Sequence, residues 1–364
     1  MMSSVEDGFH IMKNQSNIIC ILLIGPMSTE IGGARISFQH LVNHLQIRSD
    51  VTIVTIDTHG IRNGGLLAAW RFAKLLYSIT RLLPRSDIIS LQMSVTGVPV
   101  LGPFVVALAR IYKRPLVFRQ FGGLGYDGLS GVRAWITKFV CKHSNLYLAQ
   151  TKALLDVAMR DGIHHASWFP TSRPRIEEEQ KAGVVKTQCR RFVFVGQLKV
   201  EKGLQVLVHA AEGLPKDYVV DVYGPWYDLP KDTFDNAEHV RYCGVIPPAE
   251  VTRTLNHYDA LLLPTFLEQE GYSGVILEAY SVGIPVIATR WNPLPEIVLD
   301  GQTGLLVKPK DPADLCAAML KLMQDDALYV RLSKGAAAFG QQFSMENQSE
   351  KFVACCQSLV AKRK

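Results

Sequence analysis

The sequence lacks the cysteine spacing of a disulfide scaffold or of a structural zinc site. Its seven cysteines are odd in number, and no two of them stand in a C-x2-C pattern. Disulfide frameworks and structural zinc sites depend on paired, regularly spaced cysteines. We therefore expect reduced thiols, most of them in the core of a cytosolic protein.

Long apolar runs are also missing. Residues 1–16 are mixed and polar, so no apolar segment of signal-peptide length precedes Asn17. The run Ile18–Ile24 has only the length of a strand, and no run reaches the roughly eighteen apolar residues that a membrane span needs. These absences predict a cytoplasmic protein that is neither secreted nor inserted across a membrane.

The sequence does contain enough apolar residues for two domains. With 364 residues and 48% hydrophobic composition, the chain exceeds the size of one ordinary domain. Apolar strand-like runs alternate with helical stretches, which predicts an α/β fold of two doubly wound parallel sheets. The segment 177–186 is charged and poor in large apolar residues, as a domain boundary is. We thus predict a first domain over 1–185 and a second over 186–344.

Charge is divided unevenly between the two halves. Residues 1–175 hold 19 Lys and Arg against 9 Asp and Glu, an excess of +10, whereas the other 20 basic and 24 acidic residues give −4. A basic half predicts contact with something anionic, such as a membrane surface, a phosphate-bearing substrate or nucleic acid. No recognised nucleic-acid reader motif accompanies it, so we expect no nucleic-acid partner. An uneven but merely solvated surface is the alternative.

Two predicted helices of the first half combine basic and aromatic residues. The helix over 66–83 contains Trp70 and has a mostly basic polar face without acids. The helix over 132–143 repeats this mixture around Trp135. Such helices are typical of proteins that lie on an anionic bilayer, although the covering helices of an α/β domain can also have a cationic outer face. Peripheral attachment to the inner face of the plasma membrane is therefore a hypothesis.

The stretch 264–290 carries the strongest indication of chemistry. Two carboxylates, Glu270 and Glu278, follow an apolar strand and frame a glycine-containing segment. If a helix begins near Gly274, Glu278 falls within its first two turns and Glu270 lies on the preceding loop, so both face one cavity. A helix N-terminus offers free N–H groups and partial positive charge, which suit a phosphate or diphosphate. The stretch therefore predicts nucleotide binding at the carboxyl ends of the strands.

The same stretch resembles a known signature. The string EGYSGVILEAYSVGIPVIAT, over 270–289, is similar to the E-x7-E signature of retaining family 4 glycosyltransferases, which have the GT-B fold. Two glutamates eight residues apart are a weak signal alone, but PEIV at 295–298 and DGQTGLLV at 300–307 follow in the family's order. The specific motifs cover 190–345. The resemblance implies two Rossmann-like domains facing each other across a cleft, with a last helix over 345–364 that packs back on the first domain.

The resemblance also implies roles for individual residues. Glu278 would hold the ribose hydroxyls of a nucleotide-sugar and Glu270 would lie near the donor sugar, although chemistry alone allows Glu270 to be a base, a nucleophile or a hydroxyl-binding carboxylate. Lys202 would neutralise the departing diphosphate. We therefore predict Glu270 and Lys202 as catalytic residues. The predicted donor-binding residues are Gly33, Gly196, Gln197, Lys199, Lys202, Gly224, Tyr272, Ser273, Gly274, Val275 and Glu278.

Two positions depart from the family's pattern. Gln197 stands where an arginine on the diphosphate is usual, and Lys199 is our candidate for restoring that charge. A cleft histidine is usual where this sequence has Gln120 and Phe121, which leaves the role of their loop open. We place Gln120, Phe121 and Gly32 on the acceptor side. A tight turn that requires glycine is the alternative for Gly32.

The implied function is sugar transfer from a UDP- or GDP-sugar to a saccharide acceptor, with retention of configuration. Neither a metal nor another cofactor is expected, and the sequence has no D-x-D. The basic, aromatic first half favours a polyprenyl-diphosphate-linked acceptor at a bacterial inner membrane, as in assembly of lipopolysaccharide O-antigen, capsule or exopolysaccharide. A soluble acceptor, a GT-B nucleotide-sugar epimerase and a non-catalytic, membrane-associated nucleotide-sugar-binding protein are the alternatives.

Overall fold

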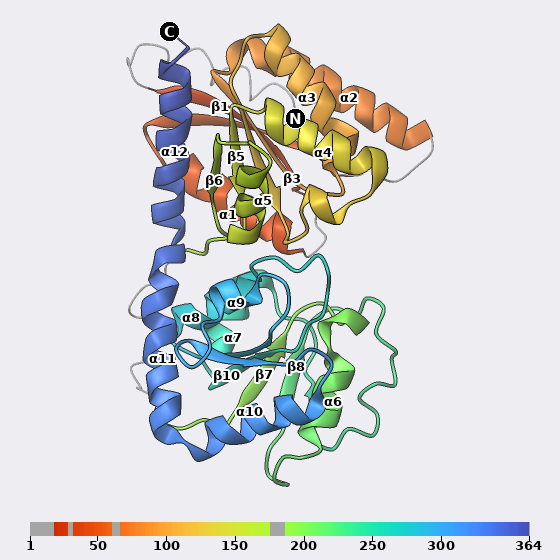
Figure 1. Cartoon of the computed structure of the whole chain (residues 1–364), viewed down its shortest axis with the longest axis vertical. Helices are drawn as coiled ribbons and strands as arrows, with labels where there is room; N and C mark the ends of the chain where they lie inside the picture. The colour runs from red at the N-terminus through yellow and green to blue at the C-terminus, as the bar shows by residue number, and fades with distance from the viewer. Residues whose placement is uncertain (1–17, 28–31, 60–65, 175–185, 364) are drawn as a thin grey trace.

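The computed structural model describes residues 18–27, 32–59, 66–174 and 186–363. They form two α/β domains, one above the other in Figure 1, each built on a six-stranded sheet. The strand orders are β2-β1-β3-β4-β5-β6 and β12-β11-β10-β7-β8-β9, and every pair of neighbouring strands is parallel. Both orders contain a point where the chain changes direction across the sheet, which opens a crevice at the carboxyl ends of the strands. The predicted pair of doubly wound parallel sheets is confirmed.

The first domain alternates strands and helices. Its strands are β1 (Ile19–Gly25), β2 (Val51–Asp57), β3 (Ile88–Ser94), β4 (Leu116–Phe121), β5 (Leu146–Ala149) and β6 (Ala166–Trp168). Its helices are α1 (Gly33–Gln46), α2 (Leu66–Leu82), α3 (Val98–Ile111), α4 (Gly131–His143) and α5 (Lys152–Arg160). The run 21–24 in the inner strand β1 is fully buried, as an apolar strand covered by helices on both faces predicts.

Alternate residues of β1 contribute to two separate cores. Leu22 and Ile24 pack in a cluster that contains side chains of α2, α3 and α4. Ile21 and Leu23 pack in a second cluster, with side chains of α1. Since successive side chains of a strand point to opposite faces, these helices cover the two faces of the first sheet.

The second domain repeats this plan around one continuous core. Its strands are β7 (Phe192–Val195), β8 (Val220–Tyr223), β9 (Val240–Tyr242), β10 (Ala260–Leu263), β11 (Val286–Thr289) and β12 (Gly304–Val307). Its helices are α6 (Leu204–Ala211), α7 (Val251–Leu255), α8 (Gly274–Ser281), α9 (Leu294–Ile297), α10 (Pro312–Gln324) and α11 (Asp326–Gly340).

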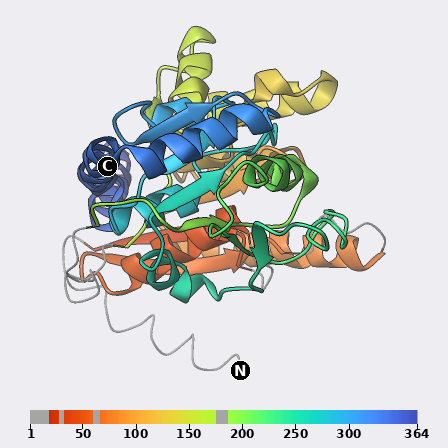
Figure 2. The same ribbon diagram turned by 90° about the horizontal axis from the view of Figure 1, so that it is seen from below.

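The last helix, α12 (Met345–Ala361), contributes to the core of the first domain. Figure 1 shows α11 and α12 as a blue column beside both domains, and the column lies at one side of the sheets when the molecule is seen from below (Figure 2). Met345, Phe352 and Cys356 are buried in the cluster that also holds Phe38 of α1. The first domain is therefore completed by residues that follow the second domain in the sequence.

Two chain segments cross between the domains, and they pair with each other. In the segment after β6, the Arg173 N–H donates to the Phe343 carbonyl at 3.1 Å, and the Met345 N–H donates to the Arg173 carbonyl at 2.8 Å. These bonds form a parallel bridge between Arg173 and Ser344. Both crossovers are thus fixed at a single place between the domains.

The predicted elements differ from the structure at proline-containing and short segments. Helix α3 begins at Val98 and continues through Pro103, a residue type that usually ends or kinks a helix. Pro99 lies in the first turn of α3. The backbone N–H that proline lacks would have no partner within the helix at that position. The sequence predicts neither β6 nor α9. These elements have three and four residues, which are too few to show the hydrophobic periodicity of a strand or a helix. The predicted boundary segment lies outside the described residues except for Lys186.

We expect Phe352→Ala to destabilise the protein by about 3–5 kcal/mol, because the buried ring packs in the first-domain core and its loss leaves a cavity. Urea denaturation followed by tryptophan fluorescence measures the change. Lys351→Ala is the matched control, since Lys351 is the exposed neighbour on the same helix. That change should stay within about 0.5 kcal/mol. Equal losses in the two variants would contradict the packing of α12 on the first domain.

Candidate functional site

A cavity of about 360 Å³ lies between the domains, at the carboxyl ends of both sheets. The first domain contributes the start of α1 and the loops after β3 and β4, and the second contributes the loops after β7, β8 and β10 and the start of α8. Most residues predicted for the site are brought together here. Those that line the cavity are Gly32, Gly33, Phe121, Gly196, Gln197, Lys202, Gly224, Glu270, Tyr272, Ser273, Gly274, Val275 and Glu278.

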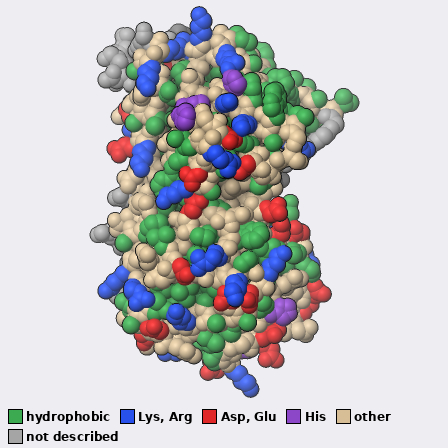
Figure 3. Space-filling view, in the orientation of Figure 1, with side chains coloured by type: hydrophobic (Ala, Val, Ile, Leu, Met, Phe, Trp, Pro, Cys, Tyr) green, Lys and Arg blue, Asp and Glu red, His purple; other side chains and the backbone are tan. Residues whose placement is uncertain are grey.

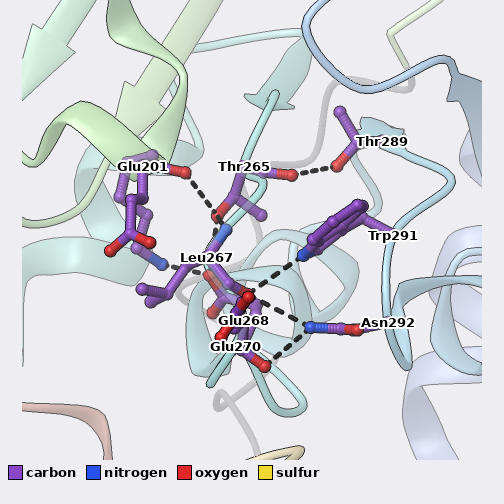
Figure 4. A network of polar contacts seen from close by, with 9 residues as sticks. Glu201, Thr265, Leu267, Glu268, Glu270, Thr289, Trp291 and Asn292 are labelled. Atoms are coloured by element: carbon purple, nitrogen blue, oxygen red, sulfur yellow. Dashed lines mark hydrogen bonds and ion pairs between the residues drawn. The ribbon is translucent and has the colours of Figure 1, made fainter.

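A polar network holds the loop that carries Glu270 (Figure 4). The Thr265 hydroxyl donates to Glu270 Oε2 at 3.0 Å. Further along, the Trp291 indole N–H and the Asn292 side-chain amide both donate to the Leu267 carbonyl, at 3.1 and 3.2 Å. These bonds tie the loop after β10 to the segment after β11, so the fold itself sets the position of the carboxylate.

Glu270 forms a buried ion pair with Lys202. Glu270 Oε2 lies 2.5 Å from Lys202 Nζ, and the two side chains are 7% and 12% exposed. Gly203 follows the lysine with a φ of 77°. A β-carbon at Gly203 would lie 2.0 Å from the Pro264 carbonyl oxygen, so glycine is what lets this turn approach β10 closely. The two residues predicted as catalytic are therefore in direct contact.

Helix α8 begins at Gly274, as the sequence predicts, and its first turn lines the cavity. The Ser273 side chain makes no capping hydrogen bond. The backbone N–H groups of the first turn and the positive end of the helix dipole are thus directed at the cavity, which suits an anionic group. Glu278 lies one turn further on, and its buried carboxylate also lines the cavity.

Arg173 is a site residue that the sequence does not indicate. Its Nε lies 2.5 Å from Glu278 Oε1, and its Nη1 donates to Ser37 Oγ of α1 at 3.4 Å. The guanidinium lies over the first turn of α8, because a β-carbon on Gly274 would be 1.5 Å from its Nη2. The only sequence signal is an arginine beside Pro174 near the predicted domain boundary. Arg173 thus joins the crossover segment, the first domain and the E-x7-E helix.

The surroundings of Arg173 carry further positive charge. Arg119 of β4 is almost fully buried between Phe121 and Phe169, with its Cζ 4.8 and 4.6 Å from the two ring centroids. Burial, reinforced by the charge of Arg173, lowers the pKa of Arg119 to about 9 and the pKa of His40 to about 4. His40 is therefore neutral near pH 7. Arg173 lines the cavity, whereas Arg119 and His40 are not among its lining residues.

Glycines bring the two domains into backbone contact beside the cavity. The Gly123 N–H donates to the Gln269 carbonyl at 3.4 Å, and a β-carbon at Gly123 would lie 2.0 Å from the Glu270 carbonyl oxygen. Gln150, at the end of β5, joins the same region by accepting the Gly122 N–H at 2.5 Å. The loop after β4 borders the cleft as expected, and larger residues at Gly123 would push the domains apart.

Gln120 and Lys199 lie outside the cavity, contrary to expectation. Gln120 is fully buried, where its amide donates to the Leu124 carbonyl and its Oε1 accepts the Tyr147 hydroxyl. These bonds shape the loop after β4 instead of facing an acceptor. Lys199 lies over the Tyr227 ring, with Nζ 4.1 Å from the centroid. It therefore does not restore the charge of the family's usual arginine at the cavity.

Glu296, in the PEIV segment, has a role across the domains that the sequence does not reveal. Its carboxylate oxygens accept the backbone N–H groups of Lys152 and Ala153 at 2.6 and 3.0 Å, so it caps α5 of the first domain from α9 of the second. The Tyr272 hydroxyl donates to the same carboxylate at 2.5 Å. Burial, together with this bond, raises the pKa of Tyr272. The signature segment thus contributes to how the domains fit together.

All seven cysteines are free, as predicted. Within the described residues, no three His, Cys, Asp or Glu side chains are grouped so that they could hold a metal ion. In the same part of the chain, no helix combines the length and the apolarity needed to cross a membrane.

Two doubly wound domains that face each other across such a cavity define the GT-B architecture. Comparison with solved structures agrees. HepE of Anabaena, in complex with UDP, has a TM-score of 0.74 and 15% identity, covering 93% of this chain and 100% of that one. WaaB, a lipopolysaccharide outer core galactosyltransferase, has a TM-score of 0.68 and 16% identity, covering 93% and 99%. At these identities the likeness shows the fold, which is GT-B.

The second domain can be assigned to a family. Residues 189–325 match the family model described as glycosyl transferases group 1, so this domain belongs to that family and the resemblance of the E-x7-E segment is confirmed. D-inositol 3-phosphate glycosyltransferase of Corynebacterium efficiens is 30% identical over 197 residues, which are 50% of this chain and 46% of that one. The chain spans about half the length of the curated relatives it matches.

We expect Arg173→Ala to lower stability by about 3–5 kcal/mol, because it leaves Glu278 buried without its partner. Adding Glu278→Ala should cost less than the sum of the two single changes, since no charge is then left unpaired. Thermal unfolding measures all three variants. The more exposed pair Arg48–Asp50 provides the control, and Arg48→Ala should cost at most about 1 kcal/mol. Additive effects at Arg173 and Glu278 would contradict a direct ion pair.

Proposed function

We propose that the protein is a retaining glycosyltransferase that moves a sugar from a nucleotide-sugar to a saccharide acceptor and needs no metal or other cofactor. The observation that carries the proposal is the pair of buried carboxylates, Glu270 and Glu278, on either side of an uncapped helix start in the interdomain cavity. The family match of the second domain supports it.

The donor would bind on the second-domain side of the cavity. Its diphosphate suits the first turn of α8, where backbone N–H groups and the helix dipole favour negative charge. Gly196 and Gly224 let the loops after β7 and β8 approach each other at the cavity wall, since a β-carbon at Gly224 would lie 1.7 Å from the Gly196 carbonyl oxygen. Glu278 would accept the ribose hydroxyls. A UDP-sugar is the first donor to test, because HepE shares the fold and was determined with UDP.

Arg173 would take part in donor binding. It contacts one oxygen of Glu278 and covers Gly274, and these are the groups assigned to the ribose and the diphosphate. A ribose hydroxyl at Glu278 would compete with the guanidinium, while the diphosphate would offer it a new anionic partner. Donor entry would then give Arg173 a new anionic partner, while the ribose hydroxyls would donate hydrogen bonds to the Glu278 carboxylate.

Lys202 would act on the leaving group. Glu270 holds its ammonium at 2.5 Å on the cavity wall. A cation fixed there stabilises the negative charge that develops on the diphosphate as its bond to the sugar breaks. This is the task that a divalent cation performs in metal-dependent transferases. Glu270 would thus serve twice, by orienting the lysine and by accepting hydroxyl groups of the donor sugar.

We propose a lipid-linked saccharide acceptor, such as a polyprenyl-diphosphate-linked intermediate of bacterial surface polysaccharide. The support is the apolar surface of α2–α4, an exposed set of side chains on the outer face of the first domain (Figure 3). Basic residues of α2 and α4 lie among them, which suits an anionic bilayer. One fold neighbour, WaaB, is itself described as a lipopolysaccharide outer core galactosyltransferase. The apolar surface comprises Leu66, Leu67, Trp70, Tyr77, Val100, Phe104, Ile111, Val132 and Trp135.

We expect UDP or a UDP-sugar to raise the melting temperature more than GDP, ADP, CMP and their sugars. At about 100 times its Kd, a ligand stabilises the folded protein by about 2.7 kcal/mol. Glu278→Ala should abolish this shift, because it removes the ribose partner. Glu212→Ala, at an exposed acid of the same domain, should retain it. An unchanged shift in Glu278→Ala, or no shift with any nucleotide, would contradict the donor site.

We expect Glu270→Ala to reduce sugar transfer by at least about 10²–10³-fold while retaining stabilisation by the nucleotide. Release of nucleotide in the presence of a lipid-linked acceptor measures transfer. Addition of EDTA should leave the wild-type rate unchanged if no metal is needed. Formation of an epimer from the donor alone would favour an epimerase instead, and full turnover by Glu270→Ala would contradict its assigned role.

We expect the double variant Trp70→Ser/Trp135→Ser to lose binding to vesicles of mixed neutral and anionic lipids by about tenfold or more, because two exposed aromatic groups no longer enter the interface. Flotation with liposomes measures the bound fraction. Tyr227→Ser is the control, since Tyr227 is an equally exposed aromatic residue of the second domain. Equal binding by both variants would contradict attachment through α2–α4.

A further inference from the structure

A second cavity of about 360 Å³ lies where α3, α4 and α12 end, at the amino end of β4 and thus at the opposite edge of the sheet from the donor cavity. Its wall is partly apolar, with Val106, Ala109, Leu116 and Leu359. No acidic side chain occurs among the described residues that line it. The basic residues of the lining are Arg110, Lys113, Arg114, His143, Lys362 and Arg363.

The positive side-chain charge of this cavity is larger than the negative charge at the helix C-termini around it. Each helix C-terminus carries roughly half a negative charge, so three of them amount to about −1.5. The five lysines and arginines of the lining carry +5. Asp87 is the acid close to Arg114, and its carboxylate also accepts the Cys20 N–H at 2.8 Å. Burial, together with the charge of Arg363, lowers the pKa of Arg114, as expected where cations outnumber acids.

Lys113 occupies a backbone position that usually belongs to glycine. The Arg114 N–H donates to the Ala109 carbonyl at 2.8 Å and the Lys113 N–H to the Arg110 carbonyl at 3.1 Å, so α3 ends in a Schellman motif. Lys113 has a φ of 50°, in the left-handed region where any side chain costs conformational energy. A non-glycine residue held there marks a candidate functional position. Here its side chain lines the basic cavity.

The exposed face of α3 leads to this cavity. Val100, Phe104, Ala107 and Ile111 follow one another at steps of three or four residues, and all four are exposed and apolar. They form part of the outer face on which the apolar surface of α2–α4 lies. Basic side chains gather at the adjoining end of the molecule, near the end of α12 (Figure 3). Lipid chains along this stripe would bring a head group to the cavity.

We propose that this cavity binds the phosphate head group of an anionic lipid, with Arg110, Lys113 and Arg363 as its cationic partners. The apolar part of the wall then receives the first carbons of the acyl chains, and the stripe on α3 follows these chains. The site would fix the orientation of the first domain on the membrane. It rests on the membrane attachment proposed above but uses residues distant from both the donor cavity and the tryptophans of α2 and α4.

Lys113→Gly separates binding from folding. Glycine is favoured in the left-handed conformation, so the melting temperature should not fall. Loss of one cation should weaken binding to phosphatidylglycerol-containing vesicles by about fivefold, while binding to pure phosphatidylcholine vesicles stays as in the wild type. Lys310→Gly is the matched control, because Lys310 has a φ of 60° in the second domain. It should leave both kinds of binding unchanged.

Calorimetry with soluble dihexanoyl phosphatidylglycerol tests the cavity without a bilayer. Binding by the wild type and loss of binding in Lys113→Gly would support the head-group site, even if no vesicle is bound and attachment through α2–α4 fails. Equal binding of the lipid by Lys113→Gly and Lys310→Gly would overturn it. Inorganic phosphate that binds as tightly as the lipid would also overturn it, since the cavity would then recognise free phosphate alone.

Discussion

The buried ion pair between Arg173 and Glu278 is the constraint on which the interdomain geometry depends. Two charges removed from water are stable only if each has its partner in good geometry, so this pair fixes where α8 stands relative to the crossover segment. The same arginine reaches Ser37 of α1 through its side chain and Ser344 through its backbone. One residue therefore links the first domain, the crossover segment and the E-x7-E helix.

The basic character of the first half of the sequence can be related to two cavities in the structure. Part of the excess of +10 in residues 1–175 lies at two ends of the first domain. At the carboxyl ends of the strands, Arg173 lines the donor cavity, and at the amino ends the cations of the second cavity face the opposite way. Both places suit phosphate, one on a nucleotide and one on a lipid.

The local part of the site could be predicted from the sequence, and the part formed between domains could not. The strand, loop and helix that carry Glu270 and Glu278 are adjacent in the chain, so their spacing alone indicated one cavity. Arg173 and Glu296 contact partners that are 105 and about 144 residues away in the sequence. Hydrophobic periodicity within a short segment cannot predict contacts at such sequence separations. Gln120 is different, because alternation along β4 turns it away from the face of Phe121, and that rule was available from the sequence.

The position of α12 has a consequence for the order of folding. Domains often fold from the amino terminus as the chain is synthesised, but the core of this first domain includes Phe352 and Cys356. Those residues are made only after the whole second domain has been synthesised. The second domain can therefore fold first, while the core beside α1 in the first domain stays incomplete until α12 packs against it.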